Sequence, residues 1–280
     1  MNKDGFVARA HRSASFSFGA VLVAMLILAA ALSLVWTPYS PAAIDVPHRL
    51  LEPSFAHWLG TDSLGHDVVS QLLAGAGISI LVGIIAVGIG LVLGVALGLI
   101  AASARGVVEV VIMNLCDFTF AFPALLLAIM LTAVLGAGVI NAIMAIGVAN
   151  VPIFARLTRA VGHGVLARDY ALAARAAGKG PSAIALEHVL PNVAPALIVQ
   201  ATIQFAIAIL AEAALSYLGL GAQPPQASWG RMLSDAQQQM FAAPRLAIFP
   251  GLAVALAVLG LNLLGDGLRD LLDPRLRARR

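Results

Sequence analysis

Cysteine and charge are both scarce in this sequence. Among 280 residues, 11% are charged, 6% are aromatic and only Cys116 is a cysteine. A single cysteine excludes an intrachain disulfide and any metal site that needs several thiolate ligands. Because Cys116 lies in an apolar run, a small buried thiol is its expected role. We therefore predict no redox chemistry for this chain.

Nucleotide-binding and catalytic motifs are also missing. The sequence contains no GxxxxGK[ST], GxSxG or HExxH pattern, and the GAG at residues 75–77 is not a dinucleotide-binding fingerprint. No serine, histidine and aspartate are arranged as a credible catalytic triad. We predict that the chain is not an enzyme and has no catalytic residue, no metal site and no cofactor of its own.

Apolar side chains, by contrast, make up 60% of the residues and give a mean hydropathy of +0.94. A monomer in water could not cover so much apolar surface, which predicts an integral membrane protein. The net charge of +3 fits basic loops on one side of a membrane, and no basic patch interleaved with aromatic residues points to nucleic acid. The lipid bilayer is the expected surrounding, and nucleic acid is not an expected partner.

Six membrane-spanning helices fit the apolar runs. A hydrocarbon core about 30 Å thick needs about 20 helical residues. The run 118–155 would be about 57 Å long as one helix, so it must contain two spans with a break near Gly136, Gly138 and Asn141. The second half of the run 68–104, from about residue 78, makes the second span, and the first half can be a helix that lies at the surface. The predicted fold class is all-α, with spans at residues 16–36, about 78–104, two within 118–155, 194–217 and 246–265.

These spans divide the chain into a first helix and a five-helix core. The first span is too long for a signal peptide and is interpreted as retained. The predicted boundaries are 1–15 for an N-terminal tail, 16–36 for the first helix, 37–75 for a loop, 76–266 for the core with its segments 156–192 and 219–245, and 267–280 for a C-terminal tail.

The distribution of Lys and Arg predicts the orientation. Fourteen of the 17 basic residues fall on the side that holds both termini and segment 156–192. The positive-inside rule makes that side cytoplasmic, and it makes loops 37–75 and 219–245 extracytoplasmic. We expect a multi-pass protein of the cell inner membrane.

The stretch 169–192, DYALAARAAGKGPSAIALEHVLPN, is a basic, alanine-rich segment between two apolar runs. Its residues 170–177 are strong helix formers without β-branching, which predicts a short helix. Gly178 and Gly180 can end that helix by adopting positive φ, and Pro181 can begin the next one. A helix boundary is expected at Pro191, where the chain returns to the membrane.

A polar helix of this kind in a membrane protein is expected to dock a partner. The small alanine side chains allow close backbone approach, and Arg175 and Lys179 supply charge. A surface helix without a partner is the alternative.

The same stretch resembles the cytoplasmic "EAA" loop of permease subunits of binding-protein-dependent ABC importers. In that pattern a Glu and two Ala are followed by a Gly and, about a dozen residues later, by Leu-Pro. Leu172 stands in place of the Glu, and His188 stands in place of an apolar residue. The resemblance implies that residues 170–177 form a coupling helix that enters a cleft on an ATPase. The coupling residues that it implies are Tyr170, Leu172, Ala173, Ala174, Arg175, Gly178, Leu190 and Pro191.

Three further motifs are similar to the C-type permeases of dipeptide, oligopeptide and nickel importers. They are HWLGTDSLGHDVVSQLLAGAGIS (57–79), EAALSYLGLGAQPPQASWGRML (212–233) and FPGLAVALAVLGLNLLGDGLRDLLDP (249–274). The resemblance implies a type I importer fold like that of MetI and half of a translocation pathway for peptides. It also implies a B-type permease partner in a heterodimer, two ABC ATPases that bind ATP and magnesium, and an extracytoplasmic solute-binding protein.

Other functions are less favoured. Uptake of nickel or a metal chelate would use the same architecture. A stand-alone ion-coupled carrier would be expected to show inverted repeats, and no convincing repeat is present. An intramembrane hydrolase would need a catalytic pair, for which Asp117 and Glu212 are the only candidates.

Two ionisable residues in apolar runs are candidates for the translocation pathway. Glu212 interrupts the fifth run, where a carboxylate is costly and usually faces a cavity or a partner. Asp117 lies near the predicted start of the third span. For both, a structural role near the membrane surface is the alternative. A group of metal-ligand residue types near position 60 has loose spacing, so we expect a folded loop there: His57, Asp62, His66 and Asp67.

Overall fold

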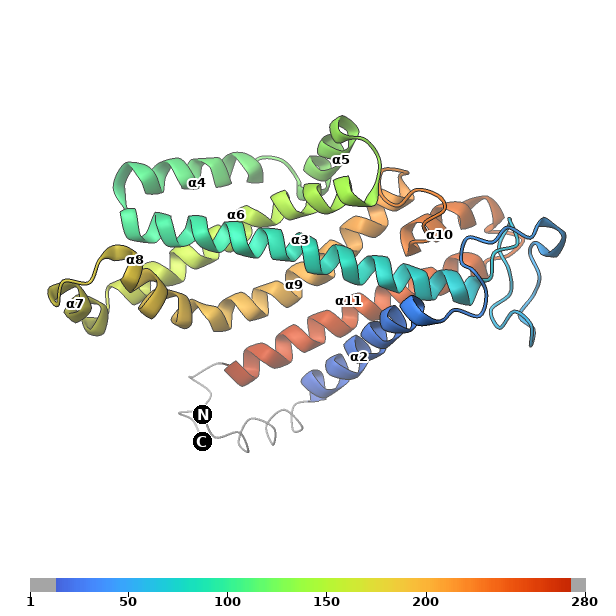
Figure 1. The fold of residues 1–280 in the computed structure, drawn as a ribbon, viewed down its shortest axis with the longest axis horizontal. Helices are drawn as coiled ribbons and strands as arrows, with labels where there is room; N and C mark the ends of the chain where they lie inside the picture. The colour runs from blue at the N-terminus through green and yellow to red at the C-terminus, as the bar shows by residue number, and fades with distance from the viewer. Residues whose placement is uncertain (1–13, 273–280) are drawn as a thin grey trace.

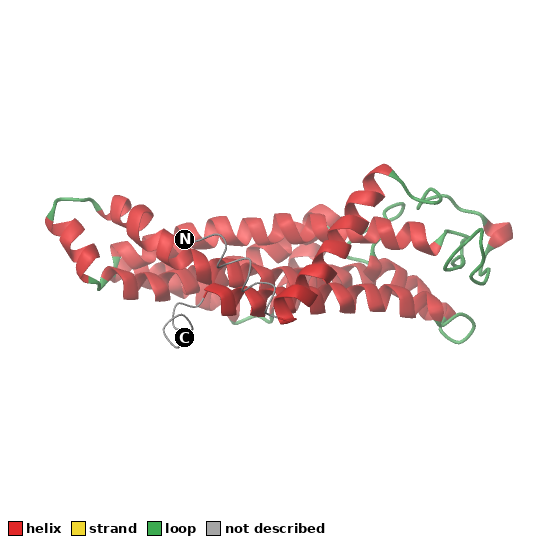
Figure 2. Ribbon diagram, turned by 90° about the horizontal axis from the view of Figure 1, so that it is seen from below, coloured by secondary structure: helices red, strands yellow, loops and turns green. Residues whose placement is uncertain are grey.

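The computed structural model describes residues 14–272, so most of the two predicted tails lies outside the described residues. Long helices run side by side along one axis (Figure 1), and the loops gather at the two ends of the bundle (Figure 2). Apart from a single bridge between Thr61 and Asp67, the regular structure of this range is helical. The predicted all-α class is confirmed.

The helices have the following bounds in chain order: α2 (Ala14–Val35), η1 (Val46–His48), α3 (Val68–Ala104), α4 (Gly106–Phe120), α5 (Ala124–Leu135), α6 (Val139–Leu166), α7 (Asp169–Ala176), α8 (Pro181–Ile184), the π-helix η2 (Ala185–Val189), α9 (Leu190–Tyr217), α10 (Trp229–Ala236), η3 (Gln237–Gln239) and α11 (Arg245–Leu272). We call the end of the bundle that carries α7 the α7 end. The opposite end, formed by residues 36–67 and α10, is the loop end.

Among residues 14–272, five helices are long and apolar enough to cross a membrane, and the pair α4 and α5 makes a sixth span if it counts as one. The predicted break between the third and fourth spans is confirmed, with φ of +97° at Gly136 and +149° at Gly138. The third span is not one straight helix, because α4 and α5 meet at 86°. Pro123 begins the turn into α5 and restricts the residue before it to extended conformations, which ends α4.

Two helices extend beyond the limits predicted for the membrane spans. The third helix begins at Gly106 instead of residue 118, because the carboxylates of Glu109 and Asp117 are paired with arginines of α6 and do not interrupt a helix. For the same reason, α6 continues past residue 155 to Leu166.

The predicted surface helix before the second span is also absent, since α3 is one helix from Val68 to Ala104. Its first turns are covered by Trp229 of α10, whose indole Nε1 donates to the carbonyl of Leu72 at 3.0 Å. The predicted core boundary at residue 76 therefore falls inside a helix.

The helices α3 and α6 pack through a row of glycines. A Cβ at Gly90 would lie 2.4 Å from Asn150 Cβ, and one at Gly94 would lie 2.5 Å from the carbonyl oxygen of Val151. Small residues of this kind let membrane helices approach closely. Gly90, Gly94 and Gly98 of α3 therefore face α6.

The group of metal-ligand residue types at the loop end separates into two pairs. His57 Nδ1 lies 3.0 Å from Asp67 Oδ1, and His66 Nδ1 lies 2.7 Å from Asp62 Oδ2. Asp67 also caps α3 by accepting from the Ser70 amide at 2.8 Å. Within residues 14–272, no three His, Cys, Asp or Glu side chains are arranged to hold a metal ion. The hydrogen bonds among these side chains support the interpretation as a folded loop.

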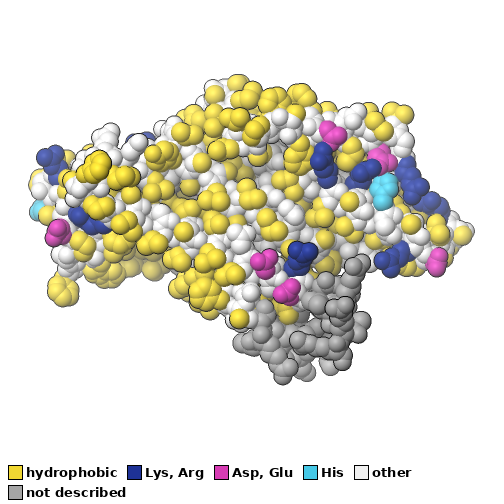
Figure 3. Space-filling model, turned by 180° about the vertical axis from the view of Figure 1, so that it is seen from behind, with side chains coloured by type: hydrophobic (Ala, Val, Ile, Leu, Met, Phe, Trp, Pro, Cys, Tyr) yellow, Lys and Arg dark blue, Asp and Glu magenta, His cyan; other side chains and the backbone are white. Residues whose placement is uncertain are grey.

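The surface reflects a membrane setting. On the face that Figure 3 shows, hydrophobic side chains cover most of the middle of the bundle, and most charged side chains lie toward its two ends or beside the chain termini. Such a band matches the hydrocarbon core of a bilayer.

Candidate functional site: the segment between α6 and α9

The helix α7 forms where alanine-rich sequence predicts it. It covers Asp169–Ala176, within one residue of the predicted range. Gly178 follows it with φ +82°, and its amide donates to the carbonyl of Arg175 at 3.0 Å. The Lys179 amide donates to the carbonyl of Ala174 at 3.1 Å, so the last carbonyls of α7 are satisfied within the segment. Gly180 has φ −70°, so the predicted positive φ is confirmed at Gly178 and wrong at Gly180.

Nearly all of this segment is open to its surroundings. In α7 only Ala171 is buried, at 3% exposure. From Leu172 to Ser182 every residue is exposed except Ala174, which packs partly against the main apolar cluster. The result is a short, rigid helix with small, exposed side chains at the tip of the bundle (Figure 1).

Two contacts join α7 and the loop that follows it to η2. The rings of Tyr170 and His188 meet edge to face, with centroids 5.8 Å apart. Lys179 forms an ion pair with Glu187, and this hydrogen bond and charge lower the pKa of the Glu187 carboxyl. Both partners belong to η2, so Tyr170 of α7 and Lys179 of the following loop each contact η2.

The chain does not turn at Pro191, contrary to the sequence prediction. The reversal occurs at residues 177–180, and Pro181 begins α8 as expected. From there the helix is continuous to Tyr217. Pro191 has no N–H to donate. The amide of Leu190, the residue before it, donates a hydrogen bond to the carbonyl of Ala185, five positions back. The local consequence of the proline is therefore a π-helical turn in place of a helix end.

The predicted coupling residues are consequently split between two places. Tyr170 to Gly178 lie on or beside α7, whereas Leu190 and Pro191 lie at the start of α9. Leu190 packs against the main apolar cluster, and Pro191 is exposed. Leu172, at the position of the family's Glu, is 48% exposed on α7.

A network of ion pairs near the α7 end joins α4 to α6. Arg159 lies 2.5 Å from Glu109, and His163 Nε2 lies 3.1 Å from the same carboxylate. Asp117 is paired with Arg156, so its observed role is to hold α4 on α6. These pairs join residues 39 or more positions apart in the chain, and no local sequence pattern could have revealed them.

Glu212 lies at the other end of the bundle, where α9 meets α10. It is 1% exposed and accepts a hydrogen bond from the Ser216 hydroxyl at 2.6 Å. The Ser216 oxygen in turn accepts from the Ala222 amide at 2.8 Å. Glu212 thereby secures the connection between Tyr217 and α10. Asp117 and Glu212 have different partners and are not paired with each other.

The sequence matches the family described as "Binding-protein-dependent transport system inner membrane component" over residues 94–278. The chain belongs to this family. The permease is 42% identical over 260 residues to a dipeptide transport system permease protein of Alkalihalophilus pseudofirmus. This alignment covers 93% of this chain and 86% of the relative. It is 45% identical over 226 residues to a glutathione transport system permease protein of Pectobacterium atrosepticum, and this alignment covers 81% of this chain and 75% of the relative.

A third relative is a di/tripeptide transport system permease protein of Pseudomonas aeruginosa, 44% identical over 268 residues and covering 93% of this chain and 88% of the relative. Among solved structures, an inward-facing MetNI methionine ABC transporter matches with a TM-score of 0.58 at 18% identity, over 72% of this chain and 96% of that chain. The predicted family and the predicted importer permease fold are both confirmed.

Proposed function

We propose that the permease forms half of a membrane pathway through which an ATP-driven importer takes up short peptides. The exposed α7, fastened to the helix that continues as α9, is the observation that carries this proposal. The relatives named for dipeptide, di/tripeptide and glutathione transport support a peptide as the solute. Their names do not favour the nickel or metal-chelate alternative.

The proposed partners are a B-type permease, two ABC ATPases that bind ATP and magnesium, and a solute-binding protein. In this arrangement the α7 end faces the cytoplasm and the loop end receives the binding protein. This chain itself performs no catalysis. Its part is to convert movement of an ATPase into movement of helices.

The connectivity of α7 explains how such movement would be transmitted. A short link joins α7 to α6, and α8, η2 and α9 form one continuous helix on its other side. A displacement of α7 would therefore act on two spans at once. A switch of this type needs contacts that differ between its two states, and an exposed helix held by an ATPase cleft can supply them.

Docking would depend on close approach to the alanines of α7 and on Arg175, because Leu172 removes the acidic contact that the family pattern offers. We expect Ala173→Trp to prevent the ATPases from copurifying with the two permeases, since a bulky indole on an exposed position keeps a partner backbone away. Copurification and ATP-dependent uptake of a labelled dipeptide into proteoliposomes would be measured together.

Val107→Trp is the matched control, because Val107 is 79% exposed on α4 near the same end of the bundle. It should leave copurification unchanged. Normal copurification and normal uptake in the Ala173→Trp complex would refute the docking role of α7. Uptake by the permease alone, without ATPases or ATP, would refute the importer assignment itself.

Glu212 and Asp117 stay predictions as residues of the solute route. Each has a structural partner within this chain, so a role in the route would come in addition to a role in packing.

A further inference from the structure

A side-chain amide, that of Asn150, is buried in the middle of α6. It is 4% exposed, and its Nδ2 forms no hydrogen bond with any residue between 14 and 272. Residue 150 comes 11 positions after Val139, where α6 begins, which is about 17 Å along the helix. Half of a hydrocarbon core about 30 Å thick is about 15 Å, so this amide lies near the middle of the bilayer. A polar group without a partner at that depth is unfavourable, which points to a ligand that completes its hydrogen bonds.

Asn150 lines a groove of about 370 Å³ between α5, α6 and α9. It is the only polar side chain among the lining residues, and the others are two leucines, two isoleucines and five alanines. The Cβ of Asn150 is held close to α3, where a Cβ on Gly90 would lie only 2.4 Å away. The amide beyond that Cβ can turn about its last bond, so that either its nitrogen or its oxygen meets the groove. The groove therefore combines small apolar walls with one group that can donate or accept.

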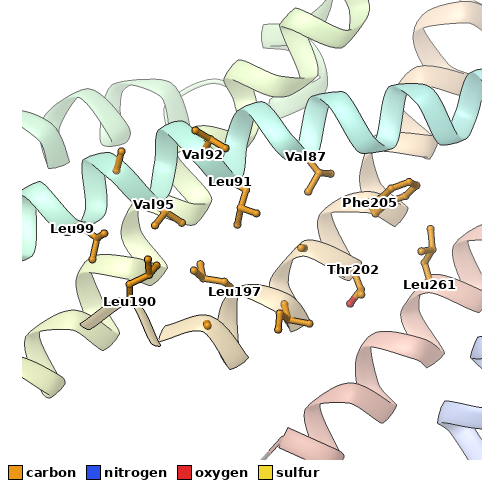
Figure 4. Close-up of a pocket in the computed structure, with 14 residues that line it drawn as sticks. Val87, Leu91, Val92, Val95, Leu99, Leu190, Leu197, Thr202, Phe205 and Leu261 are labelled. Carbon is orange, nitrogen blue, oxygen red and sulfur yellow. The ribbon is translucent and has the colours of Figure 1, made fainter. Parts of the chain in front are cut away.

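A larger cavity in the bundle does not share this feature. It has a volume of about 690 Å³ between α3, α9 and α11 (Figure 4), and Thr202 is its only lining residue with a polar side chain. The Thr202 hydroxyl already donates to the Val199 carbonyl at 2.8 Å. The walls of this cavity thus leave no side-chain donor unpaired, whereas the groove at Asn150 does.

The unpaired amide discriminates between three candidate occupants of the groove. A lipid acyl chain has no hydrogen-bonding group. A helix of a partner protein has its backbone N–H and C=O groups paired within itself, and the groove wall on α9, from Ile207 to Ala214, is only about 10 Å long. A short peptide has a free N–H and a free carbonyl on its peptide bond, and Asn150 can pair with either. The volume of the groove also falls within the range of about 300–1,000 Å³ that is typical of small-molecule sites.

We propose that this groove is a subsite on the solute route, where Asn150 hydrogen-bonds to the peptide bond of a short peptide and the alanine-rich walls receive one apolar side chain. The inference rests on the proposed function and adds to it the part of the solute that this chain recognises. The charged ends of the peptide remain in water, because the groove has no charged side chain. The site therefore favours short peptides that carry an apolar side chain.

The test compares two solutes that differ in their hydrogen-bonding groups. They are labelled alanyl-leucine and its trans-alkene isostere, in which CH=CH replaces the CO–NH of the peptide bond. Each is preloaded on the solute-binding protein, so that the preference of that protein does not enter the comparison. ATP-dependent uptake is measured with the complete complex in proteoliposomes. We expect Asn150→Leu to lower the ratio of peptide uptake to isostere uptake about fivefold, which is the effect of one net hydrogen bond.

Gln204→Leu is the matched control. Gln204 is also a buried amide, 3% exposed with an unpaired Oε1, but it is not among the residues that line the groove. This variant should keep the wild-type ratio. Both solutes are measured in one preparation, so the ratio does not depend on how much of the complex has assembled. An equal fall in both variants would show that these amides act through packing and would overturn the proposal.

A second variant tests the apolar walls. Ala211→Phe fills part of the groove and should lower the uptake of alanyl-leucine relative to that of glycyl-glycine, which has no side chain to place there. An unchanged ratio in either Asn150→Leu or Ala211→Phe, with ATP-dependent uptake retained, would overturn the site and leave the proposed function standing. Absence of ATP-dependent peptide uptake by the wild-type complex would refute the proposed function, and this site with it.

Discussion

Gly178 is the residue whose backbone ends α7 and allows the chain to return to the membrane. Its φ of +82° is unfavourable for any residue with a Cβ by about 1–2 kcal/mol, although no atom lies within 4 Å of the position that a Cβ would take. A substitution there would therefore act through backbone conformation and not through a clash.

We predict that Gly178→Val shifts or loosens the C-terminal end of α7 and uncouples ATP hydrolysis from uptake in proteoliposomes. Gly180→Val is a matched control, since Gly180 has φ −70° and equally open space around it. It should retain coupled uptake. Equal behaviour of the two variants would contradict a role for the positive φ.

Glu212 offers a second test at the scale of one residue. Glu212→Gln keeps an oxygen that can accept from the Ser216 hydroxyl, so this variant should assemble with near-normal stability. Glu212→Leu leaves Ser216 without its acceptor in a buried site, which should cost about 1–3 kcal/mol of stability. Thermal unfolding in detergent would measure the difference. Reduced uptake by a well-assembled Glu212→Gln complex would instead assign Glu212 to the solute route.

At the scale of helices, the contact between α3 and α6 is the one most dependent on small residues. A side chain at Gly94 would meet the carbonyl oxygen of Val151, which cannot move aside without distorting α6. Gly88, on the same helix, has no atom within 4 Å of its would-be Cβ.

Gly94→Leu is therefore expected to destabilise the permease by about 1–3 kcal/mol, the range typical of overpacked cores. Gly88→Leu should be close to neutral. Size-exclusion chromatography after a heating series would compare them. If Gly94→Leu kept wild-type thermal stability, the close packing of α3 and α6 would be refuted.

The α4–α6 network shows why sequence patterns failed for the third span. An isolated Glu or Asp in an apolar run is expected to mark its end, because a lone buried charge is costly. Glu109 and Asp117 instead meet arginines that lie 50 and 39 positions further along the chain. Only the packing of α4 against α6 brings these charges together.

For the molecule as a whole, orientation in the membrane can be tested directly. In a Cys116→Ala background, Arg175→Cys on α7 should react with a membrane-impermeant maleimide only after the cytoplasmic face is exposed. Trp58→Cys at the loop end, where Trp58 is 59% exposed, should react in intact cells whose outer membrane is permeable. The reverse pattern would invert the predicted topology and remove α7 from the side where ATP is hydrolysed.

Local chemistry alone determined much of this protein. Apolar run lengths predicted six spans, and the alanine-rich stretch predicted α7 to within one residue. Gly136 and Gly138 predicted the break between two spans, and Gly178 predicted the positive φ that ends α7. The spacing of Ala173, Ala174, Gly178, Leu190 and Pro191, together with three further motifs, indicated the family, which the comparison confirms. These features depend on neighbours in the sequence, so they can be recognised before folding.

Tertiary structure decided the rest. The 86° bend between α4 and α5, the single long α3 beneath Trp229 and the continuity of the helix through Pro191 all depend on contacts between distant residues. The burial of Glu212 against the α10 junction and the apolar cavity between α3, α9 and α11 likewise arise only when several helices meet. A side chain's partners are set by packing, whereas its tendency to form a helix or a turn is set by the residue itself.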